Sequence, residues 1–219
     1  MRTVVFDLDG TLADTSADLI AAANACFRGL GHGDLLDQTD ALTALHGGRA
    51  MLRLGFGRLG IVSEAAVDAQ YPVLLAAYGA AIDRHTRIYP GVVAAVEELR
   101  RAGYATAVCT NKPEGLAETL LQRLGVRDLF GALVGAGTLP VRKPDPAPLL
   151  EAIRRAGGDA RRALLVGDTA TDRDTGRAAG VPVALVTFGP EGTGVARLDP
   201  DALLDRFADL GAVAARLIR

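Results

Sequence analysis

Five short apolar runs in the chain show no polar alternation, and each ends at polar or turn-forming residues. A strand of a parallel sheet that is covered on both faces has this pattern, because neither of its faces meets water. The pattern therefore predicts buried strands over residues 3–6, 105–109, 132–134, 163–166 and 183–186.

Stretches with helical periodicity lie between the later strands. They cover residues 92–102, 115–124, 146–156 and 174–179, and a last one covers 201–217. Strands that alternate with helices indicate a doubly wound parallel sheet, the arrangement of an α/β protein. Ligands of such sheets bind at the carboxyl ends of the strands, so functional side chains are expected at that edge.

Residues 16–87 break this alternation. They show helical patterns over 17–30, 39–54 and 63–82 and no convincing strand. We expect an all-helical cap domain inserted after the first strand, with Tyr89, Pro90 and Gly91 as the hinge that returns the chain to the core. The predicted domains are a discontinuous core, residues 1–15 and 88–219, and the cap, residues 16–87.

Composition narrows the possible functions of this chain of 219 residues. Its net charge of -2 provides no basic face for nucleic acid. No apolar run approaches the ~20 residues of a membrane span. The chain starts with a strand and not with a secretory signal, and Cys26 and Cys109 fit no disulfide framework. We therefore expect a cytoplasmic protein, either a monomer or a homodimer, with neither nucleic acid nor membrane as a partner.

Two aspartates, Asp7 and Asp9, directly follow the first strand in the stretch VVFDLDG. Side chains two residues apart in a strand share a face, so the two carboxylates should lie on the same side. At short range they repel each other unless a cation lies between them or one keeps its proton. The stretch therefore predicts a bound positive charge.

Polar residues follow the other strands as well. Thr110 and Asn111 come after the second strand, and Lys143 follows the third. Asp168 and Asp172 come after the fourth. Because the carboxyl ends of parallel strands meet at one edge of the sheet, we expect all these side chains to converge there.

Lysine is rare in this chain. Of 24 lysines and arginines only Lys112 and Lys143 are lysines, and each directly precedes a proline. Codon bias explains the arginines but not the positions of the two lysines. Because arginine cannot replace lysine where a compact point charge is needed, we expect at least one of the two to be functional.

The residue types indicate the chemistry. Clustered aspartate oxygens without histidine or cysteine suit a hard cation, and with a phosphate to share, Mg²⁺ fits better than Ca²⁺. Asp168 would hold the metal, with Asp172 as a further ligand or a supporting residue. Asp7 can attack a phosphoryl group and form an aspartyl phosphate. Asp9 is placed to protonate the leaving oxygen and later to deprotonate the attacking water.

Two further side chains complete the predicted site. Thr110 can donate a hydrogen bond to a phosphoryl oxygen, and Lys143 can neutralise charge on the phosphate and on Asp7. Phosphoryl transfer needs mainly positioning and charge stabilisation, which these residues supply. The sequence therefore predicts an enzyme that acts on a small phosphorylated metabolite.

The motifs DLDGT, TN, KP and GDTATD, in this order, resemble the four motifs of the haloacid dehalogenase-like hydrolase superfamily, and the resemblance covers nearly the whole chain. Within it, the stretches DLDGTLADTSADLIAAANA, YPGV, CTNKP, RKPDPAPLL and VTFGPEGTG are similar to bacterial phosphoglycolate phosphatases. The resemblance implies a Rossmann-like core with an inserted helical cap. It also implies a phosphoric monoester hydrolase that uses Mg²⁺ and converts 2-phosphoglycolate to glycolate and phosphate.

The resemblance assigns roles to individual residues. It makes Asp7 both the nucleophile and a metal ligand, and Asp9 the acid/base, whose backbone carbonyl also binds the metal. Asp168 becomes a metal ligand supported by Asp172. The phosphate-binding residues that it implies are Thr110, Asn111 and Lys143.

Two positions depart from the pattern of this family, and one loop of the predicted cap is a candidate for specificity. Thr169 stands where serine is commoner, and Gly137 stands where relatives often carry aspartate. In the loop LHGGRA, Arg49 could pair with a substrate carboxylate, and the resemblance places a specificity loop about here. The alternative is a solvated arginine at a helix start.

Several rival functions share these motifs. A pyrophosphatase, a sugar-phosphate phosphatase or a phosphoglucomutase of the same superfamily would keep all of them. A dehalogenase or a phosphonatase would not need Asp9. A phospho-aspartate signalling switch also uses aspartates, Mg²⁺, threonine and lysine, but it is shorter, lacks a cap and would be undone by Asp9. An inactive binding scaffold would not need the complete set of motifs.

Overall fold

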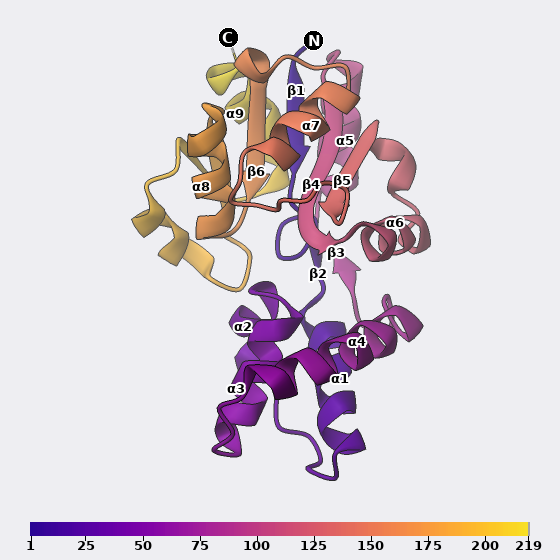
Figure 1. Ribbon diagram of the computed structural model, residues 1–219. Coiled ribbons are helices and arrows are strands. Elements are labelled where there is room, and N and C mark those ends of the chain that lie inside the picture. Colours follow the sequence, from indigo (N-terminus) through magenta and orange to yellow (C-terminus); the bar gives the residue numbers. More distant parts are fainter. Residues whose placement is uncertain (219) are drawn as a thin grey trace. The chain divides into compact units, whose positions relative to one another are not determined.

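The computed structural model describes residues 1–218 (Figure 1). The contacts within the chain divide it into two compact units. The α/β unit comprises Met1–Ala13 and the chain from Ile88 onward, and the helical unit comprises Asp14–Arg87. Among the described residues, no helix is long and apolar enough to cross a membrane.

A six-stranded sheet in the order β5-β4-β1-β6-β7-β8 forms the centre of the α/β unit. All neighbouring strands in it are parallel. The strands are β1 Thr3–Phe6, β4 Ala105–Pro113, β5 Ala132–Ala136, β6 Ala163–Gly167, β7 Val183–Val186 and β8 Ala202–Leu204. Every residue of β1 is buried, as the apolar run predicts for a strand with neighbours on both sides. The predicted α/β fold with a parallel sheet is therefore confirmed.

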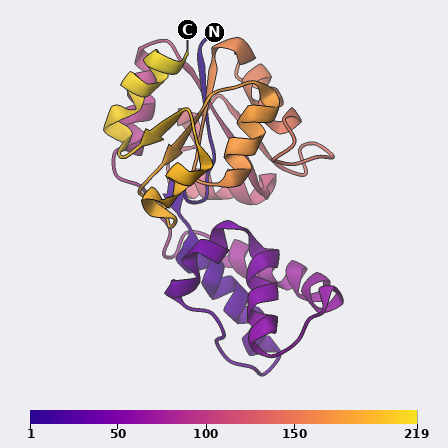
Figure 2. The same cartoon turned by 90° about the vertical axis from the view of Figure 1, so that its left-hand side faces the viewer.

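Helices cover both faces of this sheet. They are α5 Val92–Arg101, α6 Glu114–Arg123, α7 Ala147–Arg155, α8 Ala170–Ala179 and α9 Leu210–Leu217. α7 packs on β5, β4 and β1, α8 packs on β6 and β7, and α5 contacts β4 and α9. Figure 2 shows α7 and α8 on one side of the sheet and α9 on the other.

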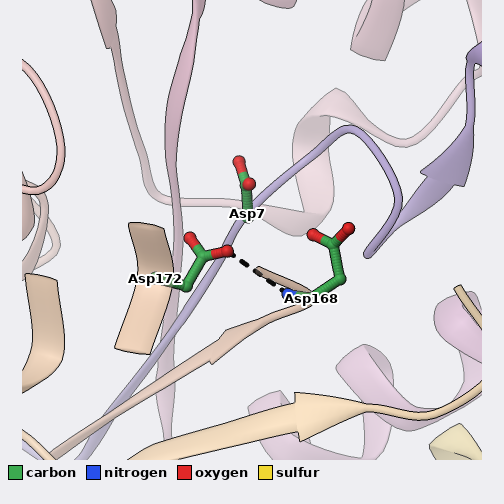
Figure 3. A group of neighbouring side chains, drawn as sticks. All are labelled: Asp7, Asp168 and Asp172. Atoms are coloured by element: carbon green, nitrogen blue, oxygen red, sulfur yellow. Dashed lines mark hydrogen bonds between the residues drawn. The ribbon is translucent and has the colours of Figure 1, made fainter. Parts of the chain in front are cut away.

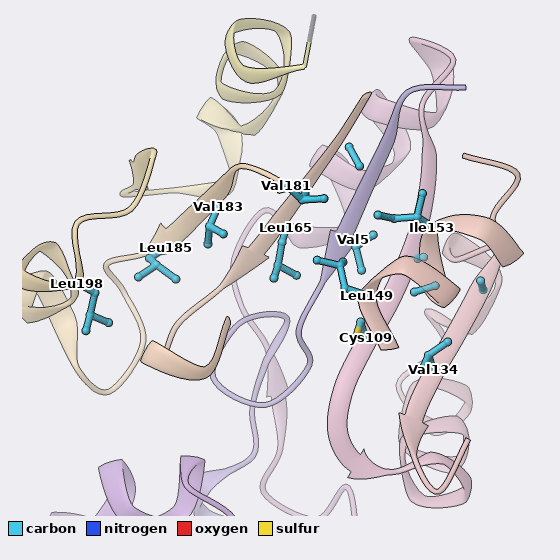
Figure 4. Close-up of a cluster of buried hydrophobic side chains, with 14 of the residues drawn as sticks. Val5, Cys109, Val134, Leu149, Ile153, Leu165, Val181, Val183, Leu185 and Leu198 are labelled. Atoms are coloured by element: carbon cyan, nitrogen blue, oxygen red, sulfur yellow. The ribbon is translucent and has the colours of Figure 1, made fainter. Parts of the chain in front are cut away.

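The hydrophobic core under α7 joins elements that are far apart in the sequence. Leu149 and Ile153 of α7 meet Val5 of β1 and Leu165 of β6 in one buried cluster (Figure 4). Burying an aliphatic side chain of this size contributes about 1.5–3 kcal/mol. This core holds the strands in register, so the residues at their carboxyl ends have fixed positions.

The predicted terminal helix over 201–217 is wrong in its first half. The chain forms strand β8 and a 3₁₀ turn, Phe207–Asp209, before α9 begins. Ala202 and Leu204 are buried and Leu203 between them is 43% exposed, which is the alternation of an edge strand. Asp201 also fixes this strand, since its carboxylate accepts a hydrogen bond from the backbone N–H of Val183 at 2.8 Å. Tertiary pairing with β7 overrides the helical propensity of these residues.

The helical unit contains α1 Ser16–Gly29, α2 Ala41–Leu45, α3 Gly48–Arg58 and α4 Glu64–Ala80, with a 3₁₀ turn at Gln38–Asp40. The predicted helix over 39–54 is wrong as one continuous element, because the chain breaks at Gly47. This glycine has φ 91°, in the left-handed region that other residues rarely adopt. Phe27 and Phe56 pack edge to face in the core of this unit, 5.4 Å between ring centroids.

A buried carboxylate fastens the end of the helical unit to its beginning. Asp18 of α1 is 3% exposed and accepts hydrogen bonds from the backbone N–H groups of His85 and Thr86 and from the Thr86 hydroxyl. Two short strands, β2 Ala13–Asp14 and β3 Arg87–Ile88, pair at the points where the chain passes between the two units.

Candidate active site

The first candidate residue, Asp7, lies at the carboxyl end of the central strand β1. Its backbone N–H donates to the carbonyl of Val166 at 2.9 Å, so it still follows the sheet. One oxygen of its carboxylate accepts from the N–H of Leu8 at 2.7 Å. The chain then turns sharply at Gly10, whose φ is 80°. The sheet therefore fixes Asp7, whereas Asp9 lies in the turn beyond it.

Three carboxylates meet at this edge of the sheet. Asp7, Asp168 and Asp172 each offer an oxygen, and these oxygens lie within 4.8 Å of one another (Figure 3). Asp168 comes directly after β6, and its Oδ1 accepts from the hydroxyl of Thr11 at 2.9 Å. Its Oδ2 is buried and has no hydrogen-bond partner among the described residues. A buried oxygen without a donor, beside two other carboxylates, fits a cation ligand.

Burial and mutual repulsion disfavour the charged forms of these carboxylates. Burial is the largest cause that raises the pKa of Asp7, to about 6, and the carboxylates of Asp172 and Asp9 raise it further while Lys143 opposes them. The pKa of Asp168 is also raised, first by burial and then by Asp172 and Asp7. A cation among these groups would relieve both effects.

Lys143 lies between two of these carboxylates. Its ammonium is 2.6 Å from Asp172 and 3.1 Å from Asp7, and its side chain is 1% exposed. Burial alone would lower its pKa, but the carboxylates of Asp172 and Asp7 raise it, so the lysine is charged. The side-chain amide of Asn111 donates to the backbone carbonyl of Lys143 at 2.9 Å. Asn111 thus holds the lysine loop, and its phosphate contact stays a prediction.

Asp172 has donors at both carboxylate oxygens. Oδ1 is bound by Lys143, and Oδ2 accepts from the hydroxyl of Thr169 at 2.9 Å and from the N–H groups of Thr169 and Asp168. Thr169 and Asp172 form a capping box at the start of α8, which begins at Ala170 and not at the predicted residue 174. This arrangement favours the supporting role that the sequence left open for Asp172 over direct metal ligation.

The second lysine also lies in the site. Lys112 is 2.8 Å from an oxygen of Asp9, and its side chain is 3% exposed. β4 continues past the predicted end at Cys109, so Thr110, Asn111 and Lys112 belong to the strand. Sequence reasoning noted both lysines but gave a role only to Lys143. The signal for Lys112 was its place in TNKP in a chain that otherwise uses arginine.

Arg49 has its partners inside the helical unit. It lies in the first turn of α3, pairs with Asp68 of α4, and is stacked over the ring of Tyr71, 4.4 Å from its centroid. Arg49 thus lies at a helix start, as the alternative expected, but its guanidinium is bound by neighbouring side chains and not by solvent alone. Its predicted contact with a substrate carboxylate stays a prediction.

Comparison with known proteins places the chain in a family. The family model of haloacid dehalogenase-like hydrolases matches residues 1–180. A phosphoglycolate phosphatase of Mesorhizobium japonicum is 41% identical over 221 residues, covering 99% of this chain and 96% of that protein. One of Agrobacterium fabrum is 39% identical, covering 94% and 89%.

A solved structure agrees with these relatives. The crystal structure of a predicted phosphoglycolate phosphatase from Haemophilus somnus has a TM-score of 0.85, with 26% sequence identity and 97% of each chain covered. The chain belongs to the haloacid dehalogenase-like hydrolase family and is therefore an enzyme, a hydrolase.

Proposed function

We propose that this enzyme is a Mg²⁺-dependent phosphatase that hydrolyses 2-phosphoglycolate through an aspartyl phosphate on Asp7. The observation that carries the proposal is the division of charge at the sheet edge. Asp7 is paired with Lys143 at 3.1 Å, and Asp9 is paired with Lys112 at 2.8 Å. Two adjacent carboxylates with separate partners can take two roles, one as nucleophile and one as acid/base.

In the first half of the reaction, a carboxylate oxygen of Asp7 attacks phosphorus. The bond from phosphorus to the ester oxygen breaks, and the electron pair stays on that oxygen. Asp9 donates its proton there, so glycolate leaves as the alcohol. Lys143, already in contact with Asp7, balances negative charge on the phosphoryl oxygens, and the hydroxyl of Thr110 would donate to one of them.

In the second half, water attacks the same phosphorus. Asp9, now a carboxylate, takes the proton of the water, and the bond between phosphorus and the Asp7 oxygen breaks. Phosphate leaves and Asp7 is again a carboxylate. Protons are balanced over the whole cycle, because the proton that Asp9 gave to glycolate is replaced by one from the water.

The residues present fit a divalent cation. Asp7 and Asp168 would hold it, together with the backbone carbonyl of Asp9, and the buried Oδ2 of Asp168 is the oxygen that lacks a donor. When bound, Mg²⁺ would neutralise the charge of the carboxylates and of the phosphoryl group at close range. Thr11 fixes the orientation of Asp168 through its other oxygen, and Asp172 holds Lys143.

The choice of substrate rests on the relatives. Two proteins that match almost the whole chain at 39–41% identity are named phosphoglycolate phosphatase. The residues of the sheet edge engage only a phosphoryl group and a metal, so another part of the protein must recognise the carboxylate of the substrate. Arg49 in the helical unit remains our candidate for that recognition.

A panel of phosphate esters tests the proposal. Release of phosphate is measured from 2-phosphoglycolate, pyrophosphate, several sugar phosphates and an aryl phosphate, with Mg²⁺ and with EDTA. We expect the highest kcat/KM for 2-phosphoglycolate and no turnover with EDTA until Mg²⁺ is restored. Preference for another ester would overturn the substrate, and full activity in metal-free buffer would overturn the metal site.

Two outcomes would point to the rival functions. Interconversion of sugar phosphates without release of phosphate would show a mutase. Labelling of Asp7 that stops after one phosphate per chain would show a signalling switch.

A further inference from the structure

Lys112 is a buried charge that pairs with Asp9, but the steps of the proposed reaction give it no task of its own. Its side chain is 3% exposed, and its ammonium lies 2.8 Å from Oδ1 of Asp9, which is 17% exposed. Removing such charges from water costs about as much as their attraction returns, so a buried ion pair is weak evidence for a role in stability. A function at the site is the better explanation.

The irregular end of strand β4 fixes the backbone of Lys112. The pairing of β4 with β5 is irregular between Cys109 and Pro113, and the backbone N–H of Lys112 donates to the hydroxyl of Thr110 at 3.2 Å. Gly135 of β5 lies so close that a Cβ there would be 2.9 Å from the carbonyl oxygen of Lys112 and 2.5 Å from the Cα of Glu114. The backbone at the end of β4 is therefore packed closely against β5, and from there the side chain of Lys112 reaches Asp9.

Asp9 needs such a partner more than Asp7 does. Asp7 follows the register of the sheet through Val166, whereas Asp9 lies in the tight turn before Gly10. An acid/base must be within hydrogen-bond reach of the oxygen that it protonates, and a displacement of an ångström can cost about 10²-fold in rate. A compact ammonium on a strand gives the carboxyl group of Asp9 a fixed point of contact.

We propose that Lys112 is the positioning residue for Asp9, and that it orients the carboxyl group of Asp9 toward the leaving oxygen and later toward the attacking water. The inference rests on the proposed function, because it takes Asp9 as the acid/base. The two lysines of the chain then have separate tasks, Lys143 at the nucleophile and Lys112 at the acid/base.

The test is the dependence of rate on the leaving group in Lys112→Met. With 2-phosphoglycolate, whose alkoxide needs a proton, kcat should fall roughly ten- to a hundredfold, a part of the ~10²–10⁴-fold that acid/base catalysis supplies. With an aryl phosphate, whose leaving group needs little protonation, formation of the phosphoenzyme should stay within a few-fold of wild type. Its hydrolysis should be slow, so a burst of aryl alcohol and an accumulated phosphoenzyme, seen by intact mass, are expected.

A double-mutant cycle separates positioning from general support of the site. In the Asp9→Asn background, Lys112→Met should lower kcat further by less than about twofold, because the group that Lys112 positions is already lost.

Thr106→Val is the matched control, since Thr106 is buried in the same strand and its hydroxyl donates to the carbonyl of Leu129. It should leave the ratio of burst to steady-state rate unchanged. Lys112→Gln, which keeps a donor, should lie between wild type and Lys112→Met, and it serves if the methionine variant does not fold.

The outcomes distinguish the inference from the proposed function. An equal loss on both substrates without accumulated phosphoenzyme, or a full additional loss in the Asp9→Asn background, overturns the role of Lys112. If Asp9→Asn itself shows no dependence on the leaving group, the acid/base assignment of the proposed function fails instead.

Discussion

The ion pairs of the two units differ in how far their side chains are exposed to solvent. In the helical unit, Arg53 of α3 forms a bidentate pair with Glu64 of α4, and the two side chains are 51% and 64% exposed. At the sheet edge of the α/β unit, Lys143 pairs with Asp172, and these side chains are 1% and 0% exposed. Exposed pairs contribute about 0–1 kcal/mol, because water competes for both partners. Buried pairs lose as much in desolvation as they gain in attraction.

We interpret the exposed pairs as charges that support packing between helices, and the buried pairs at the sheet edge as charges that serve the chemistry. Arginine is used throughout the surface pairs of the helical unit, and the two lysines of the chain are both buried beside aspartates. A compact ammonium fits where carboxylates crowd together, whereas the planar guanidinium suits an exposed bidentate pair. The predictions below test this comparison, beginning with the largest expected effect.

Removing a carboxylate at the sheet edge should have the largest effect. Asp7→Asn removes the nucleophile, so activity should fall by about 10⁴-fold or more and no phosphoenzyme should form. Asp9→Asn keeps the nucleophile and should lose ~10²–10⁴-fold, with phosphoenzyme trapped when an aryl phosphate is used. Intact mass after rapid quenching measures both. Phosphate bound covalently to Asp7→Asn would show that the roles are wrong.

Exchange of the basic residue should matter at the sheet edge and not in the helical unit. Lys143→Arg should cost about 10²-fold in kcat/KM, because the larger guanidinium displaces the charge from Asp7 and Asp172. The matched exchange Arg53→Lys, in an exposed pair, should change the free energy of unfolding by less than about 1 kcal/mol and leave kcat/KM unchanged. A Lys143→Arg enzyme within about twofold of wild type would contradict this interpretation.

Arg49 is the residue of the helical unit for which we predict a chemical role. Arg49→Ala should lower kcat/KM for 2-phosphoglycolate roughly ten- to a hundredfold, the cost of a lost charge-assisted hydrogen bond of ~1.5–3 kcal/mol. Hydrolysis of an aryl phosphate, which has no carboxylate, should hardly change.

The partner of Arg49 supplies the control. Asp68→Asn removes the ion pair but keeps the arginine, so it should leave hydrolysis of 2-phosphoglycolate intact. If both variants lose equally small amounts of stability and neither loses activity, Arg49 serves only the packing of α3 on α4. An equal loss on both substrates would also assign it a structural role.

The smallest expected effect is a pH dependence of metal binding. Burial raises the pKa of Asp7 from 3.8 to about 6, so without metal the folded state binds this proton more tightly than the unfolded state does. Its contribution to stability is therefore fully present at low pH and is lost as the pH rises through about 6. Mg²⁺ competes with the proton for Asp7. The free energy of stabilisation by Mg²⁺, obtained from the rise in Tm, should be smaller at about pH 5.5 than at about pH 7.5, by on the order of 1 kcal/mol.

Asp7→Asn is the control for this titration. Asparagine has no proton to gain in this range, so the variant should lose the pH dependence of the Mg²⁺ effect that Asp7 causes. Differential scanning calorimetry with and without Mg²⁺ at the two pH values measures it. An Mg²⁺ effect that increases as the pH falls would contradict the assignment of Asp7 as a ligand.

The sequence by itself determined the order of strands and helices in the core and the residues at the strand ends. Apolar runs without alternation predicted five of the six strands of this sheet, because a strand covered on both faces excludes polar residues wherever it lies in the sheet. Asp7 and Asp168 follow two such runs, and parallel pairing brings their carboxylates together. Where a pattern was short or mixed, local propensity predicted continuous helix. The chain instead forms a strand at Ala202–Leu204 and breaks the helix at Gly47.

Only the tertiary structure decided which partner each charged group has. Lys112 and Asp9 are 103 residues apart in the sequence, and Thr11 and Asp168 are 157 apart. No periodicity predicts such pairs, because they depend on the bend at the end of β4, the close approach of β5 at Gly135 and the turn after β1. The sequence placed the candidate groups at one edge of the sheet, since that follows from local pattern and parallel pairing. The packing of the strand ends against one another paired Lys143 with Asp7 and Asp172 and paired Lys112 with Asp9. A buried charge cannot exchange its partner for water, so these pairs depend on the tertiary structure.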